Sequence, residues 1–372
     1  MKIYFDNAAT TPLDQEVIDL MYETSKNVFG NPSSIHSFGR KAKAAIERSR
    51  KIIAKYLNAS PLDIVFTSCG TESNNMILNM AVKKYDIQHL IISEFEHNCV
   101  LNTAEVLTEN QGIKLHKVSV NEKGNVNLLE LEEILSQLDG NKLVSIMHAN
   151  NEIGTIVDLK QVGEICKKHT AMFHSDSVQT MAHFPLDVKR LNINYLAGSA
   201  HKFHGPKGVA FVYMRSDSRL EAFINGGGQE RSYRSGTENL ISIVAMGKAF
   251  ELAHKNMESR KNHIIEIKNY LQKRLLAEID GIQFNGDPES CLYTVLSTSF
   301  PPRFTSDMFL FNLDLSGVAC SGGSACASGA QKASYVLQAI NHPEDRQTIR
   351  FSFSHLNTKK EVDYLIEVLK NM

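Results

Sequence analysis

Several features are missing from this sequence of 372 residues, and each absence excludes a class of protein. No apolar run approaches the length of a membrane span, and the N-terminal stretch turns polar at Asp6, unlike a signal peptide. The net charge is only -1, which gives no reason to expect nucleic acid or an acidic membrane as a partner. We therefore expect a cytoplasmic protein.

Closely spaced cysteine pairs are also absent. None of the six cysteines has a C-x-x-C partner; they are Cys69, Cys99, Cys166, Cys291, Cys320 and Cys326. Zinc or cluster ligation usually needs such pairs, and a reducing cytosol disfavours disulfides. The sequence therefore predicts neither a metal site nor a disulfide.

Two of these thiols lie in the run "GVACSGGSACASGA", residues 317–330, which is rich in Gly, Ser and Ala. This run leaves two interpretations open: small-residue packing, or a nucleophile on a mobile loop. We expect Cys320 to end a strand, and a resolving role for it is a weak alternative. The other four cysteines are interpreted as structural, with Cys69 and Cys99 as small buried residues.

What the sequence does contain is an alternation of apolar strand-like runs and amphipathic helical stretches. Strands are expected within residues 63–68, 89–93, 114–120, 143–148, 171–176, 193–200 and 208–214. Helices are expected between them, for example at 74–84 and 159–168. This pattern predicts an α/β fold with a mostly parallel seven-stranded sheet covered by helices. A helix pair at 240–279 leads to a small α+β unit.

Polar residues gather directly after successive predicted strands. They are Gly70-Thr71, Glu96-His97, Asn150-Asn151-Glu152, Asp176 with Gln179, and Ser199-Ala200-His201-Lys202. In parallel α/β sheets the ligand crevice lies outside the carboxyl ends of the strands. One such residue alone would be a helix cap or a structural histidine, but five clusters in order indicate a site.

The chemistry of these clusters indicates an anionic aromatic ligand. Gly70 and Thr71 open a helix whose N–H groups can hold a phosphate, and Ser199 and His201 could add donors. There is no G-x-x-x-x-G-K-[ST] run and no G-x-G-x-x-G after a strand, which disfavours a nucleoside triphosphate or a dinucleotide. A strand-end lysine such as Lys202 can form a Schiff base, and Asp176 can pair with a pyridinium nitrogen. Together they describe pyridoxal 5'-phosphate (PLP).

Nine motifs resemble those of the cysteine desulfurases, PLP enzymes of fold type I in the class V aminotransferase superfamily. They are "DNAATTP" (6–12), "FGNPSSIH" (29–36), "GTESNN" (70–75), "EHN" (96–98), "HANNEIG" (148–154), "HSDSVQ" (174–179), "SAHKFHGPKG" (199–208), "RSGTEN" (234–239) and "SGGSACASG" (321–329). The resemblance is closest to the branch that supplies sulfur for iron–sulfur clusters and tRNA thiolation. It implies a large PLP-binding domain at 14–255 and a small domain at 1–13 and 256–372.

The resemblance also implies a role for each matching residue. Lys202 would bind PLP as an imine, Asp176 would hold the ring nitrogen protonated, and His97 would stack on the ring and transfer protons. The phenolic oxygen of the ring would be bonded by Asn151 and Gln179. The phosphate would be bound by Gly70, Thr71, Ser199 and His201. Thr237 would reach the phosphate of a neighbouring subunit, which implies a homodimer. Arg350 and Asn31 would hold the substrate carboxylate.

Cys326 would be the nucleophile. It would take the sulfur of L-cysteine as a persulfide, leave L-alanine, and pass the sulfur to an acceptor such as a cluster scaffold or a tRNA-thiolation enzyme. Three alternatives stay open: a selenocysteine lyase or another class V PLP lyase or aminotransferase, a Cys–His hydrolase, and a non-catalytic sulfur carrier. Two departures stand out, because Phe353-Ser354-His355 replaces a usual Leu-Gly-Arg and the chain stops at Met372, short of the tail that helps longer members dock the scaffold.

Overall fold

A seven-stranded sheet forms the centre of the larger part of the molecule in this computed structural model, which describes residues 1–306, 308–322 and 334–372. Its strands are β2 (Ile64–Thr67), β3 (His89–Ser93), β4 (Lys114–Val118), β5 (Lys142–Ser145), β6 (Met172–Asp176), β7 (Tyr195–Ser199) and β8 (Ala210–Met214). Their order is β2-β8-β7-β6-β5-β3-β4, and β8 points in the direction opposite to the other six strands. The mostly parallel sheet and its seven strands are confirmed as predicted.

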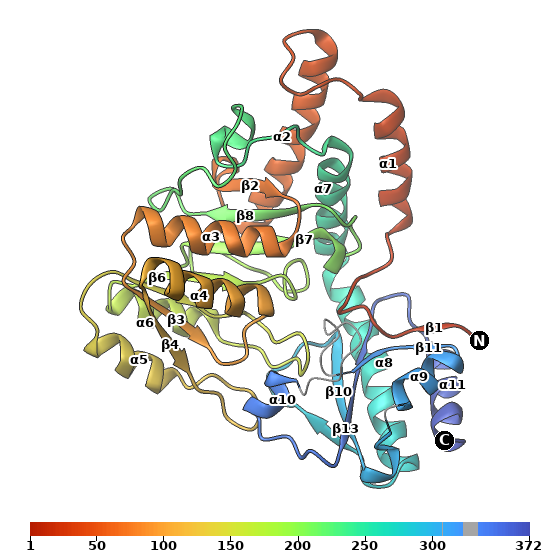
Figure 1. Cartoon of the computed structure of the whole chain (residues 1–372). Helices are drawn as coiled ribbons and strands as arrows, with labels where there is room; N and C mark the ends of the chain where they lie inside the picture. Colours follow the sequence, from red (N-terminus) through yellow and green to blue (C-terminus); the bar gives the residue numbers. More distant parts are fainter. Residues whose placement is uncertain (307, 323–333) are drawn as a thin grey trace.

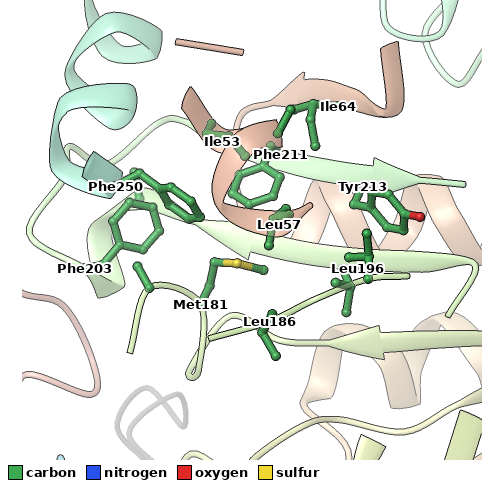
Figure 2. Close-up of a cluster of buried hydrophobic side chains, with 14 of the residues drawn as sticks. Ile53, Leu57, Ile64, Met181, Leu186, Leu196, Phe203, Phe211, Tyr213 and Phe250 are labelled. Atoms are coloured by element: carbon green, nitrogen blue, oxygen red, sulfur yellow. The ribbon is translucent and has the colours of Figure 1, made fainter. Parts of the chain in front are cut away.

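Helices cover both faces of this sheet (Figure 1). They are α1 (Gln15–Asn27), α2 (Ser37–Leu57), α3 (Gly70–Lys84), α4 (Asn98–Gln111), α5 (Leu128–Gln137), α6 (Leu159–Lys168) and α7 (Leu240–Lys255). Successive strand side chains point to opposite faces, so Val65 packs in the cluster that includes α3 and α4, whereas Phe66 packs in the cluster that includes α2 and α7. Figure 2 shows the second cluster, where Phe211 of β8 lies among Ile53, Met181 and Phe250.

A smaller unit follows α7. It contains α8 (Met257–Glu278), β9 (Gln283–Asn285), β10 (Val295–Phe300), α9 (Phe309–Leu315), β12 (Ser321–Gly322), α10 (Tyr335–Ala339), β13 (Gln347–Ser352) and α11 (Lys359–Lys370). The four strands form an antiparallel sheet in the order β12-β13-β10-β9, and α8 and α11 share its apolar cluster. Short 3-10 turns occur at Pro61–Asp63, Ala200–Lys202, Gln229–Ser232 and Pro302–Phe304.

The N-terminal segment joins the two units. Strand β1 (Ile3–Tyr4) pairs in parallel with β11 (Val318–Ala319), and the fully buried Phe5 packs edge-on against Phe351 and Phe353. Farther along, the backbone N–H of Thr11 donates to the carbonyl of His201 at 2.9 Å. The domain boundaries themselves stay a prediction, but residues 6–11 clearly run from the small sheet to the turn that carries Lys202.

Within the described residues, no helix is long and apolar enough to cross a membrane. Cys320 directly follows β11, as expected from the sequence. Cys326 falls outside the described residues.

Candidate active site

The predicted phosphate site lies where α3 begins. Helix α3 starts at Gly70 after β2, and its first N–H groups are available to an anion. A Cβ atom at Gly70 would come within 2.9 Å of Val178 Cγ2 and 3.8 Å of Ser199 Cβ, so glycine is needed for this close approach. Ser199 is 1% exposed, and among the described residues its hydroxyl has no hydrogen-bond partner. A buried, unpaired hydroxyl beside a helix N-terminus fits a phosphate ligand.

His201 borders the same place. Its ring Nδ1 lies 3.3 Å from Thr10 Oγ1. Burial and the neighbouring Lys202 and Lys207 cations lower the pKa of His201 to about 4. The ring is therefore neutral near pH 7 and can offer one N–H donor.

Asp176 is the last residue of β6 and is held by two donors. Its Oδ2 accepts from Asn74 Nδ2 at 2.7 Å and its Oδ1 from the backbone N–H of Val178 at 3.0 Å. The side chain is nearly buried at the carboxyl end of the sheet. This geometry fixes a carboxylate that can face a protonated ring nitrogen.

Lys202 and Gln179 meet at one backbone carbonyl. Lys202 Nζ donates to Ala8 O at 2.6 Å and to Ala9 O at 2.9 Å, and Gln179 Nε2 donates to Ala8 O at 3.1 Å. The N-terminal motif "DNAATTP" thus lies against the lysine and amide that the sequence places more than 160 residues later. The sequence alone had indicated no role for this motif.

His97 immediately precedes α4 and caps it. Its ring Nδ1 accepts from the backbone N–H of Cys99 at 3.2 Å and lies 3.0 Å from Cys99 Sγ. The interpretation of Cys69 and Cys99 as buried packing residues is wrong. Cys69 is exposed because it caps α3 at the sheet edge, and Cys99 is half-buried with its thiol turned to His97.

Arg350 lies on β13 of the small sheet and is 2% exposed. It donates to the carbonyl of Asn151 at 2.8 Å and to Asp6 Oδ1 at 3.0 Å. Among the described residues its Nε has no hydrogen-bond partner. A fixed, buried guanidinium with an unused N–H is suited to a carboxylate.

Two buried carboxyl groups of the site had no role in the sequence analysis. Burial raises the pKa of Glu96 to about 8, although Ser93 and the N–H of Met147 bond its Oε1. Burial likewise raises the pKa of Glu152 to about 7, against a 2.6 Å bond from Ser334 and the nearby charge of Arg350. Their sequence signal was their place beside His97 and Asn151 in the polar clusters that follow predicted strands.

Two predicted site residues, Asn31 and Thr237, are exposed in the single chain. Asn31 is exposed in the loop between α1 and α2, which lies at the top of Figure 1, whereas β13 lies at the bottom. Thr237 is exposed just before α7. The roles expected for Asn31 and Thr237 stay predictions.

The comparison with protein families agrees with this geometry. Residues 3–365 match the family described as aminotransferase class-V. The chain belongs to the class-V aminotransferases. Its mostly parallel sheet with helices on both faces is the PLP fold type I architecture expected from the sequence.

Two curated class-V relatives show how far the likeness extends. The chain is 40% identical over 375 residues to "Cysteine desulfurase IscS" of Dictyoglomus turgidum, covering all of this chain and 94% of that protein. It is 39% identical over 366 residues to "Putative cysteine desulfurase IscS 1" of Bacillus subtilis, covering 97% and 96%. A solved structure named "NifS-like protein" superposes with a TM-score of 0.92 at 35% identity, over 100% of this chain and 99% of that one.

Proposed function

We propose that this chain is a cysteine desulfurase that uses PLP to convert L-cysteine into L-alanine and a persulfide on Cys326. The observation that carries the proposal is that Lys202 and Asp176 lie at the carboxyl ends of strands of the large sheet, where a buried Arg350 from the small sheet bonds Asn151. These groups match a cofactor-binding lysine, a ring-nitrogen partner and a carboxylate clamp. The curated relatives named as cysteine desulfurases support the same reaction.

The residues present fit PLP. Ser199 and the first turn of α3 form an anion cradle that a Cβ at Gly70 would fill, and the Asp176 carboxylate stands at the end of β6. Lys202 would bind the cofactor covalently, and Gln179 and Asn151 would bond its phenolic oxygen. When bound, PLP supplies an electron sink that weakens bonds at the substrate's carbon atoms.

The chain's own residues then position cysteine and move its protons. Arg350 binds the carboxylate and fixes the substrate's orientation. The Lys202 amine and the His97 ring hold the protons that leave and return at the substrate's carbons. The Cys326 thiolate attacks the substrate's sulfur, so one S–S bond forms while the substrate's C–S bond breaks. The carbon product gains a proton and leaves as alanine.

The persulfide is proposed to pass to an acceptor protein of iron–sulfur cluster assembly or of tRNA thiolation. A homodimer is part of this proposal, because Thr237 and Asn31 would complete the partner's site. The support within the chain is that both side chains are exposed. The selenocysteine lyase alternative gains no support from the geometry.

Replacing Cys326 with serine tests the reaction. Cys326→Ser protein should keep the visible absorbance of bound PLP yet release no sulfide from L-cysteine in the presence of a reductant, because a hydroxyl cannot carry the sulfane sulfur. In the wild type, mass spectrometry should find one added sulfur on the peptide that contains Cys326.

Cys320→Ala is the matched thiol control. Burial raises the pKa of the Cys320 thiol above its usual range, so this group stays protonated and should not replace Cys326. Undiminished sulfide release by Cys326→Ser, or an equal loss in Cys320→Ala, would contradict the assignment.

A further inference from the structure

A continuous set of hydrogen bonds connects His97 to Asp176. Asn74 Nδ2 donates to Asp176 Oδ2 at 2.7 Å and to Cys99 Sγ at 3.2 Å. Cys99 Sγ lies 3.0 Å from His97 Nδ1. Asn74 is fully buried, and among the described residues its Oδ1 has no partner, so its side chain is held by these two donated bonds. The set joins β6, α3 and α4.

The backbone of Cys99 decides which nitrogen of the neutral His97 ring carries the proton. The Cys99 N–H points to Nδ1 at 3.2 Å, and a backbone amide can only donate. Nδ1 must therefore accept in the neutral ring, which places the proton on Nε2. The ring is thus fixed with a donor at Nε2.

A protonated ring has a different need. It carries N–H at both nitrogens, so Nδ1–H then faces the N–H of Cys99 and requires an acceptor. The Cys99 sulfur, at 3.0 Å, can fill this requirement because a thiol both donates and accepts. In this state Asn74 Nδ2 donates to the same sulfur, and a further sulfur lone pair accepts from Nδ1–H.

We propose that Cys99 is a positioning residue for proton transfer by His97. Its thiol donates to Nδ1 of the neutral ring, accepts from Nδ1–H of the protonated ring, and ties the ring to Asp176 through Asn74. The inference rests on the proposed function, because it assigns Cys99 to the proton-transfer step of that reaction.

Other titratable groups surround the ring. Glu96 precedes it at the end of the β3 connection, Glu152 faces it from the turn after β5, and Asp176 lies beyond Asn74. The pKa of Glu152 is about 7 and that of Glu96 about 8, both raised by burial. The role of Cys99 must therefore be read from the difference between variants, not from one pH profile.

The test compares Cys99→Ala with Cys99→Ser in the PLP-loaded enzyme, with Cys291→Ala of the small unit as the thiol control. Alanine formation is measured as kcat/KM from about pH 5.5 to 9. In Cys99→Ala the protonated ring loses its acceptor, so the limb of the profile that reports His97 should move to lower pH by about one unit. Cys99→Ser should restore the wild-type position, because a hydroxyl also donates and accepts, and Cys291→Ala should leave it unchanged.

A second readout does not depend on turnover. NMR of 15N-histidine-labelled holoenzyme, with the His97 signals assigned by their loss in His97→Asn, should show the Nε2–H tautomer in the wild type. The same signals should titrate at lower pH in Cys99→Ala. The role of Cys99 would be overturned if the NMR signals showed an Nδ1–H tautomer or an unshifted titration in Cys99→Ala. It would also be overturned if Cys99→Ala lost activity equally at every pH, or if Cys99→Ser failed to restore the profile. A wild type that forms no alanine would overturn the proposed function instead, while the NMR titration would still test the Cys99 contact.

Discussion

At the scale of single residues, two buried carboxyl groups, those of Glu96 and Glu152, lie next to the candidate site. Glu96 is fully buried, and only Ser93 and the Met147 N–H among the described residues compensate it, while its Oε2 has no partner. Burial disfavours the carboxylate, which is why its pKa is about 8. Near neutral pH this group is therefore mostly a neutral acid next to His97.

The raised pKa of Glu96 predicts how stability changes with pH. Below about pH 4.5 the carboxyl is neutral in both the folded and unfolded states, so its burial does not lower the free energy of unfolding. As the pH rises toward 8 the unfolded state ionises first, so folding stability should fall by on the order of 2–4 kcal/mol. Glu96→Gln should remove most of this fall, measured by urea unfolding at pH 5, 6.5 and 8.

The neighbouring Glu94 supplies the control, because its side chain is exposed. Glu94→Gln should keep the wild-type pH dependence. If Glu96→Gln unfolds with the same pH dependence as the wild type, the acid is not neutral in the folded protein.

At the scale of elements, an ion pair joins the start of α1 to the small unit. Asp14 precedes α1 and accepts from Arg260 of α8 at 2.9 Å and from His355, which follows β13, at 3.2 Å. His355 belongs to the stretch Phe353-Ser354-His355, where the family resemblance led us to expect Leu-Gly-Arg. The structure explains the departure, since His355 takes up a bond to Asp14 and Phe353 packs on Phe5 while Arg350 keeps its place.

Removing the charge of Asp14 should loosen this connection. Burial alone would raise the pKa of Asp14, but the bonds from His355 and Arg260 outweigh burial and lower it to about 2. Its stabilising effect is therefore present above about pH 4 and is lost as the pH falls toward 2. Asp14→Asn should cost about 2 kcal/mol near pH 7, because it leaves Arg260 without its counter-charge.

Chemical denaturation across pH 3 to 8 measures the effect. The difference in the free energy of unfolding between the wild type and Asp14→Asn should stay constant above pH 5 and decrease at lower pH. Asp19→Asn, at an exposed position on α1, is the control and should hardly change the free energy of unfolding. A gap that widens in acid would contradict the ion pair.

At the scale of the whole molecule, one loop carries apolar side chains that a single chain leaves in water. Phe29, Ile35 and Phe38 are 71%, 91% and 54% exposed at the α1–α2 connection, at the top of Figure 1. The rings of Phe29 and Phe38 lie 5.2 Å apart and form one patch. The same connection contains the exposed Asn31, whereas β13, which carries Arg350, lies at the bottom of Figure 1. Both facts favour a second copy of this chain as the partner of the loop.

Sedimentation should therefore find a dimer of about twice 41.6 kDa. Ile35→Asp places a charge in the patch and should weaken the dimer by roughly tenfold or more. Leu129→Asp, at an 81% exposed apolar position on α5, is the matched control and should not change the mass. A wild type that sediments as a monomer, or an Ile35→Asp variant with unchanged dissociation, would contradict the arrangement.

Much of the fold could be predicted because its signals are local. The apolar runs that became β2 to β8 are bounded by turns, and the stretch at 240–279 kept its helical period through α7 and α8. The order of the strands, and the antiparallel direction of β8, depend instead on which strands pair after the chain has folded back. No local pattern encodes such pairing, since it is decided by packing between distant segments.

The sequence by itself determined which residues gather at the candidate site. Lys202, Asp176, Ser199 and the start of α3 follow strands whose carboxyl ends must share one edge, and that rule needs no coordinates. Only the tertiary structure decided what surrounds them: the Ala8 carbonyl on Lys202, Asp6 on Arg350 and the Cys99 thiol on His97. The physical reason is that hydrogen bonds and desolvation depend on distances of a few ångströms between segments that can lie hundreds of residues apart.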